Sequence, residues 1–152
     1  MITTKVNYIT PTLYEKDFYL WLETTAKLLR DRQLNQLDYE NLIEEIEAMG
    51  RSEKHALESN LIVVLMHLLK YQYQPEKRSK SWLSSIFEHR RRLVKTLQSS
   101  PSLKVYYQEV FNECYEYAVK QASIETGLLL ENFPNISLFT QEETLDFDFL
   151  PK

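Results

Sequence analysis

The sequence is poor in residues that turn, interrupt or crosslink a chain. Among its 152 residues are two glycines, five prolines and one cysteine. Sandwiches, barrels and phosphate-cradling loops need glycine where the backbone turns sharply, so this composition disfavours all three. The single cysteine, Cys114, excludes an internal disulfide and is compatible with a reducing compartment.

Long hydrophobic runs are also missing. The most apolar stretch, residues 61–69, covers nine residues and contains His67, whereas a membrane helix needs about 20 apolar residues. The first seven residues hold neither a charged leader nor an apolar stretch of signal-peptide length. We therefore expect a cytoplasmic protein that makes no membrane contact.

Most of the sequence shows helical periodicity, with apolar residues three or four positions apart. A capping box at Thr12–Glu15 predicts a first helix that runs to about Arg32. Its apolar face consists of Tyr14, Phe18, Trp21, Leu22, Leu28 and Leu29. A second helix is expected from the cap Asp38 to Gly50, where the glycine either ends or bends the helix. One face of this second helix carries Leu42, Ile46 and Met49.

The third predicted helix, from about Glu53 to Tyr73, is apolar on nearly all sides between residues 61 and 69. Such a helix needs neighbours all round, so we expect it at the centre of the fold. Ser81 is the expected cap of a fourth helix. The apolar face of this fourth helix consists of Trp82, Ile86, Leu93 and Leu97.

A fifth helix is predicted between Ser100 and Gly127, with Ser100 as its cap and Pro101 in its first position. A second capping box, Thr140–Glu143, predicts a short C-terminal helical turn. The aromatic tail that follows, Phe147 and Phe149, is expected to pack back on the body. The predicted fold is all-α: a single domain over residues 1–152, with about five bundled helices, a C-terminal turn and a flexible segment at 1–11.

Charge is distributed unevenly along the chain. Residues 70–95 hold eight Lys and Arg against two Glu, a formal +6, whereas the whole chain carries -4 and the remainder therefore -10. Aromatic side chains are interleaved with these cations, as in surfaces that hold phosphates or acidic groups. The residues expected to bind an anionic partner are Lys77, Arg78, Lys80, Arg91, Arg92 and Lys95. A solvated helix face is the alternative interpretation of this charge run.

Helical geometry, at about 100° per residue, separates the arginines of the fourth helix. Arg91, Arg92 and Lys95 fall opposite the apolar face, whereas Arg90 falls within it. A buried guanidinium must be paired, because an unpaired buried charge costs several kcal/mol. We expect a carboxylate as its partner, and Glu45 lies nearest the apolar edge of the second helix.

A polar pocket between the second, third and fourth helices is the second candidate site. Its expected residues are Glu45, His67, His89 and Arg90. A polar stripe of Asn60, His67, Lys70 and Gln74 on the third helix would line it. A satisfied buried network that sets helix register is the structural alternative to a ligand site.

A metal version of this pocket would use Glu45, His67 and His89 as ligands. The sequence has no Glu-x-x-His, no His-x-x-x-His and no cysteine cluster, so the local spacings of a bundle metal site are missing. Cys114 lies on the apolar face of the fifth helix, which predicts an inert thiol. The tyrosines of that helix, including Tyr117, are interpreted as packing. We expect neither a metal nor any other cofactor.

Several stretches together resemble a known family. They are YEKDFYLWL at 14–22, ENLIEEIEAMGRSE at 40–53, LMHLLKYQYQP at 65–75, RSKSW at 78–82, RRR at 90–92 and SPSL at 100–103. From about Leu13 to Pro151 the chain resembles the bacterial family labelled domain of unknown function twenty-nine. The resemblance implies a small all-α bacterial protein, and it implies no activity, cofactor or catalytic residue.

Two classes of function follow from these observations. The first is a binding module that engages nucleic acid or an acidic protein through the basic segment at residues 77–95. The alternative is an enzyme or small-ligand receptor that uses the polar pocket. A homo-oligomer subunit is a third interpretation, which the solution mass would test.

Overall fold

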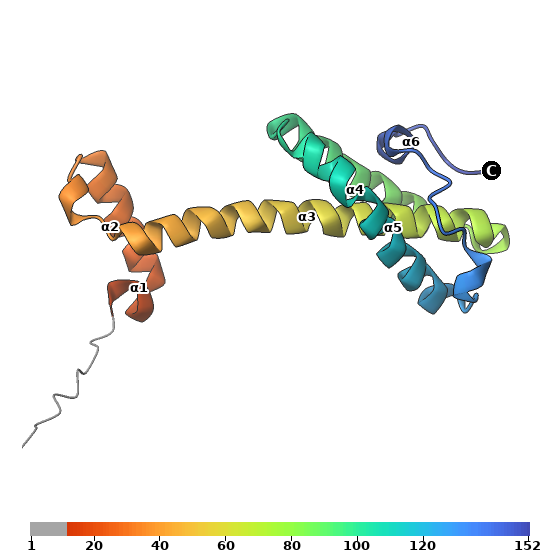
Figure 1. Cartoon of the computed structure of the whole chain (residues 1–152), viewed down its shortest axis with the longest axis horizontal. Coiled ribbons are helices and arrows are strands. Elements are labelled where there is room, and N and C mark those ends of the chain that lie inside the picture. The colour runs from red at the N-terminus through yellow and green to blue at the C-terminus, as the bar shows by residue number, and fades with distance from the viewer. Residues whose placement is uncertain (1–11) are drawn as a thin grey trace, which may run out of the picture. The chain divides into compact units, whose positions relative to one another are not determined.

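The computed structural model describes residues 12–152, and their regular secondary structure is entirely helical (Figure 1). This confirms the predicted all-α fold class. The four long helices are α2 (Phe18–Arg30), α3 (Tyr39–Tyr73), α4 (Lys80–Ser99) and α5 (Leu103–Thr126). Two short helices, α1 (Leu13–Lys16) and α6 (Gln141–Leu145), lie near the chain ends. The predicted flexible segment at 1–11 lies outside the described residues.

Backbone contacts divide the chain into two compact units, Met1–Met49 and Gly50–Lys152. The boundary falls within α3, and each unit is described by itself below. The prediction of a single domain over residues 1–152 stays a prediction. No helix in the described part of the chain is both long and apolar enough to cross a membrane.

In the first unit the predicted first helix is two helices, α1 and α2. Asp17 separates them with an extended backbone (φ -150°, ψ 87°) and accepts a hydrogen bond from the Leu20 amide at 3.0 Å. The prediction of one continuous helix to Arg32 is therefore wrong. An aspartate prefers to cap a new helix start because its carboxylate satisfies a free amide there. The predicted cap Thr12 is confirmed, since its hydroxyl accepts from the Glu15 amide.

Three aromatic rings hold the first unit together. Tyr14 packs edge-on against Trp21 at 4.9 Å between ring centroids, and Phe18 stacks on Trp21 at 5.9 Å. Trp21 is the one buried large hydrophobic residue in the described part of this unit. Phe18, Leu22 and Leu29 of the apolar face stay exposed. Helices α1 and α2 offer too little surface to cover that face.

Gly50 neither ends α3 nor serves as its cap. Helix α3 includes Gly50 as an interior residue between Tyr39 and Tyr73, so the second and third predicted helices are one. An interior glycine costs only about 1 kcal/mol relative to alanine, and the good helix formers on both sides offset it. No atom lies within 4 Å of a Cβ built on Gly50, so packing does not explain the glycine.

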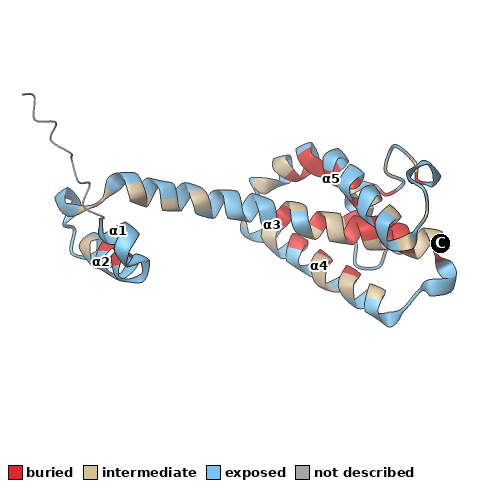
Figure 2. Cartoon of the chain, turned by 90° about the horizontal axis from the view of Figure 1, so that it is seen from below, coloured by how far each residue is buried: buried red, intermediate tan, exposed pale blue. Residues whose placement is uncertain are grey.

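The second unit contains the hydrophobic core. Leu61, Val64, Leu65, Leu68 and Leu69 of α3 have no exposed surface, which confirms that this stretch is the central helix. Helices α4 and α5 flank this part of α3, and buried residues line the facing surfaces (Figure 2). The remaining core residues from α4 and α5 include Ile86, Leu93, Tyr107, Phe111, Cys114 and Tyr115.

Two predicted caps in this unit shift by two residues. Ser79, rather than Ser81, caps α4, and its hydroxyl accepts from the Trp82 amide at 3.3 Å. Ser102, rather than Ser100, precedes α5, because residues 101 and 102 form a turn before the helix begins. The predicted stop is confirmed, since Gly127 adopts the left-handed conformation (φ 76°) that favours glycine at a helix end.

The C-terminal segment packs on the second unit as expected. The Thr140 capping box at the start of α6 is complete, with both reciprocal hydrogen bonds at 3.0 Å. Phe149 contacts Phe139 of the core, with 6.1 Å between ring centroids. Phe147 contacts Phe87 of α4 at 5.7 Å but remains 46% exposed.

Candidate functional site

The six cations of the basic segment are all exposed. Lys77 ends a 3-10 turn, Arg78 and Ser79 lead into α4, and the remaining cations project from α4 itself. The expected outward orientation of Arg91, Arg92 and Lys95 is confirmed by their exposure. The capped start of α4 and its buried face decide this orientation, because burying Ile86 and Leu93 turns the opposite side to solvent.

Arg91 and Arg92 share one carboxylate. Arg91 donates two hydrogen bonds to Glu88, at 2.8 and 3.1 Å, and Arg92 donates one at 3.0 Å. The Arg91 and Arg92 hydrogen bonds lower the pKa of Glu88 to about 2, so Glu88 is ionised at neutral pH. The three side chains together therefore carry a net charge of +1. Glu88 was missed as a site residue, although its spacing of three and four residues from the arginines indicates such a pairing.

The other cations of the segment carry no carboxylate partner among the described residues. Arg78 donates to the Tyr71 carbonyl oxygen at 2.8 Å and stacks over the Tyr71 ring at 4.0 Å. These contacts satisfy the guanidinium without neutralising it. Lys77, Lys80 and Lys95 are exposed at both ends of the segment. Positive charge thus remains at both ends of the outer face of α4.

Apolar side chains lie between these cations. Leu83 is 41% exposed and Phe87 58% exposed, one turn apart on the outer side of α4. Phe147 of the C-terminal tail extends this apolar surface through its contact with Phe87. We call Lys80, Leu83, Phe87, Arg91 and Lys95 the basic α4 face, because they follow one another at three- and four-residue spacing.

Arg90 is buried as predicted, with only 1% of its surface exposed. Its guanidinium donates to three backbone carbonyl oxygens of the C-terminal segment: Glu143 at 3.2 Å, Thr144 at 2.9 Å and Phe149 at 2.7 Å. The prediction of a carboxylate partner is therefore wrong. A helix C-terminus offers free carbonyls and a partial negative charge, which together satisfy a cation.

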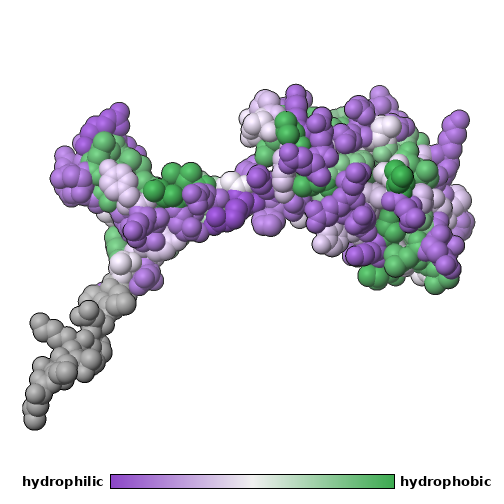
Figure 3. All heavy atoms as spheres, viewed as in Figure 1, coloured by the Kyte–Doolittle hydropathy of each residue, from purple (hydrophilic) through white to green (hydrophobic). Residues whose placement is uncertain are grey.

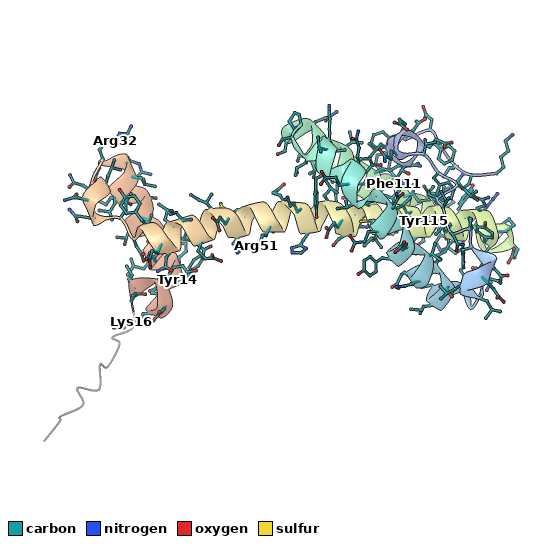
Figure 4. All side chains as sticks on the ribbon, viewed as in Figure 1. Tyr14, Lys16, Arg32, Arg51, Phe111 and Tyr115 are labelled. Carbon is teal, nitrogen blue, oxygen red and sulfur yellow. The ribbon has the colours of Figure 1, made fainter. Side chains whose placement is uncertain are left out.

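Glu45 also has a different partner from the predicted one. Its carboxylate accepts a hydrogen bond from the Tyr14 hydroxyl within the first unit (Figure 4 labels Tyr14). This hydrogen bond raises the pKa of Tyr14. The expected pairing of Glu45 with Arg90 is thus replaced by two separate sets of contacts, one in each unit. Interhelical packing decides such pairings, and helix periodicity carries no information about it.

The two histidines of the predicted pocket both lie in the second unit. His89 Nδ1 lies 2.7 Å from the Asn60 side-chain oxygen, and the Asn60 amide donates to the Ala56 carbonyl at 2.8 Å. His67 Nδ1 lies 2.9 Å from the Val63 carbonyl oxygen. Burial lowers the pKa of both histidines, and the charge of His67 lowers the pKa of His89 further. Both imidazoles are therefore neutral at pH 7.

The remaining polar stripe on α3 pairs with α5. Lys70 lies 3.6 Å from a Glu125 carboxylate oxygen and 4.7 Å above the Trp82 ring. Gln74 donates to the Thr126 carbonyl at 3.4 Å. These contacts satisfy the polar groups where α3 meets its neighbours, which is the register-setting role weighed above.

Metal and nucleophile chemistry find little support in the described residues. Within residues 12–152, no group of three or more His, Cys, Asp or Glu side chains is arranged to hold a metal ion. Cys114 is buried, and burial raises the pKa of its thiol to about 12, as expected for an inert cysteine. Tyr117 is 52% exposed, so its interpretation as packing is wrong.

A surface hollow of about 340 Å³ lies beside α5. Its lining includes Tyr115 (Figure 4), Val119, Leu130 and Phe133. Tyr115 donates to the Pro134 carbonyl at 2.8 Å, which fixes the loop that borders the hollow. The hollow contains none of the residues that the sequence singled out for binding.

Comparison with known proteins identifies one family. A family model described as "Domain of unknown function DUF29" matches residues 13–150. No curated protein and no solved structure matches the chain.

Proposed function

We infer that this chain, which belongs to the DUF29 family as its resemblance indicated, is a binding module for an anionic partner. The family's description states no activity, so the proposal rests on the site alone. The proposal uses the basic segment at residues 77–95. The observation that supports it most is the exposure of all six cations, Lys77, Arg78, Lys80, Arg91, Arg92 and Lys95.

An acidic protein surface suits this face better than nucleic acid. Glu88 offsets half of the charge of Arg91 and Arg92, which leaves fewer cations to neutralise the closely spaced phosphates of nucleic acid. Exposed Leu83 and Phe87 add apolar area between the cations. Protein interfaces combine apolar anchors with a charged rim, which matches this composition.

The enzyme or receptor alternative keeps one supporting observation. His67 and His89 each have Nδ1 held by an oxygen atom. Donating the Nδ1 proton leaves Nε2 as a free base, as general-base catalysis requires. Glu45 and Arg90, the other two expected residues, have partners elsewhere. The alternative therefore depends on two side chains rather than four.

Binding measured across a salt series tests the proposal. The probes are a polyglutamate peptide and mixed-sequence single- and double-stranded DNA. We expect salt-sensitive binding to the peptide, weakened at least about tenfold in the Arg91→Ala/Arg92→Ala/Lys95→Ala variant. The matched control, Lys104→Ala/Lys120→Ala, removes exposed lysines of α5 and leaves binding unchanged.

Three results would separate the possibilities. Binding to DNA but not to the peptide would make nucleic acid the partner and overturn the preference for protein. Equal loss in the control would show that only net charge matters and would contradict a site on α4. Absence of binding to all probes at low salt would overturn the module and favour a ligand screen at His67 and His89.

We place this binding module in the bacterial cytoplasm. The support is the composition, with one buried reduced cysteine and no disulfide in the described structure, together with the family resemblance.

A further inference from the structure

The first three turns of α3 present two unlike faces. Toward α1 and α2 lie partly buried side chains, with Glu45 bound to Tyr14. On another side of the same turns lies a row of exposed apolar residues, which we call the outer α3 stripe. It consists of Tyr39, Ile43, Ile46 and Met49, which are 53%, 52%, 60% and 65% exposed. Figure 3 shows hydrophobic surface on these turns.

This stripe is more apolar surface than a solvated helix normally carries. Isolated exposed apolar residues are common, but a continuous row over three turns marks an interaction site. Among its described residues the first unit has a single buried large hydrophobic residue, Trp21. The outer α3 stripe is therefore apolar surface that a partner could cover.

The border of the stripe is acidic. Glu40 and Glu47 lie seven residues apart and, at about 100° per residue, fall along one edge of the stripe. Residues 1–49 hold nine Asp and Glu against five Lys and Arg, a formal charge of -4. A partner that covers the stripe must place positive charge beside this edge.

The basic α4 face has the complementary composition. Leu83 and Phe87 form its apolar centre, and Lys80, Arg91 and Lys95 surround them. Each surface is a row of apolar side chains on one helix with charges of a single dominant sign alongside. Two such helices bury their apolar rows against each other while the opposite charges pair at the rim.

We propose that the outer α3 stripe of one copy docks on the basic α4 face of a second copy. The inference rests on the proposed function, because it names the acidic protein partner of the basic segment as the N-terminal unit of another copy. The contact joins two different surfaces. It forms a two-fold dimer when both copies exchange it reciprocally, and it is heterologous, producing rings or chains, when they do not.

In the competing arrangement the outer α3 stripes of two copies dock on each other, and repulsion between their acidic edges disfavours it. Antiparallel pairing of two identical stripes would place the Glu40–Glu47 edges against each other. Like charges in direct opposition are destabilising, whereas the basic α4 face supplies cations at the same edge. Charge complementarity therefore selects α4 as the docking surface.

A charge-swap experiment on the full-length protein tests the contact. Variant A carries Glu40→Lys/Glu47→Lys, and variant B carries Lys80→Glu/Lys95→Glu. These positions are exposed, and neither variant disturbs the Glu88 pairs or Arg90. Wild-type protein is expected to self-associate at low salt, as measured by sedimentation. Each variant alone should associate at least about tenfold more weakly than wild type.

Mixing the two variants provides the decisive measurement. The basic stripe of A then meets the acidic α4 face of B, and the unchanged stripe of B meets the unchanged face of A. Co-sedimentation of the mixture, with association restored toward the wild-type level, is expected. The matched control, Glu109→Lys/Glu113→Lys on the exposed side of α5, should associate like wild type. Circular dichroism verifies that every variant remains helical.

Each contrary outcome has a definite meaning. Wild-type protein that remains monomeric at all concentrations overturns the docking. Variants that lose self-association but fail to co-assemble overturn the assignment of these two surfaces to each other. Polyglutamate binding that persists in a monomeric protein leaves the proposed function standing while this inference fails. Loss of both self-association and polyglutamate binding in wild-type protein overturns the two proposals together.

Discussion

The two units use the same helical pattern and reach very different degrees of burial. In the described residues, the first unit buries one large hydrophobic residue, Trp21, whereas the second buries nineteen hydrophobic residues in one cluster. Each unit nevertheless exposes eleven large hydrophobics, although the first is less than half as long. Figure 2 shows this contrast as red helices in the second unit and mostly pale blue in the first.

The difference shows that amphipathic helices do not by themselves make a core. In the second unit three long helices enclose apolar surface from several sides, so every face of α3 between residues 61 and 69 finds a neighbour. In the first unit α1 and α2 cover only one side of the first turns of α3. Apolar residues with equal periodicity are therefore buried in one unit and exposed in the other.

The largest expected effect in the second unit follows from Arg90. Arg90→Ala removes the side-chain donor to three carbonyl oxygens, of which only that of Glu143 keeps another donor, the Asp146 amide, and it opens a cavity. The free energy of unfolding should therefore fall by about 3–5 kcal/mol. Urea denaturation measures the change. The neighbouring exposed Arg91→Ala is the control and should cost less than about 1 kcal/mol. A loss below about 1 kcal/mol for Arg90→Ala would contradict the anchoring role.

A matched pair of truncations tests directly whether the two units differ in burial. Leu65→Ala removes a side chain with no exposed surface and should lower the free energy of unfolding by about 2–5 kcal/mol. Ile46→Ala removes one that is 60% exposed, and in monomeric protein it should change stability by less than about 0.5 kcal/mol. Thermal or urea unfolding at low concentration provides both values. Equal losses of unfolding free energy would show that Ile46 is packed, and they would contradict the difference in burial between the two units.

Acid should destabilise the second unit through its histidines. Burial holds the folded pKa values of His67 and His89 below the ordinary value of 6.5, so the unfolded chain binds more protons below that pH. The free energy of unfolding should be constant above about pH 7, decline as pH falls through 6.5, and level off below the folded pKa values. Urea denaturation between about pH 7.5 and 5.5 measures this slope.

A variant without His67 and His89 sharpens the pH test. His67→Gln/His89→Gln removes both titrating side chains, and the decline over this range should then flatten. The first unit contributes no histidine to the described residues, so its stability should not follow the same slope. A slope that persists in the double variant would assign the acid sensitivity to other groups.

The smallest expected effect concerns a backbone strain in the first unit. Arg32 adopts the left-handed conformation (φ 58°) just after α2, where a side chain costs about 1 kcal/mol relative to glycine. Arg32→Gly should therefore stabilise the end of α2 by up to about 1 kcal/mol, less the loss of its hydrogen bond to the Leu29 carbonyl. Amide hydrogen exchange in α2 measures the change. Faster exchange in the variant would show that the side-chain contact outweighs the strain.

Much of the local structure could be predicted from short-range patterns. The capping residues Thr12 and Thr140, the stop at Gly127 and the buried position of Arg90 all follow from spacing along one helix. Such features depend on hydrogen bonds and side-chain phases within a few residues. The break at Asp17 depends on the same forces, yet the apolar periodicity that continues past it hides the signal.

The sequence by itself determined the helical class, the central position of residues 61–69, the inert Cys114 and the exposure of Arg91, Arg92 and Lys95. Each of these depends on composition or on the phase of a single helix. The tertiary structure alone decided that Arg90 binds backbone carbonyls, that Glu45 binds Tyr14, and that the outer α3 stripe stays uncovered. These outcomes depend on which helices meet, and contacts between distant segments leave no periodic mark on the sequence.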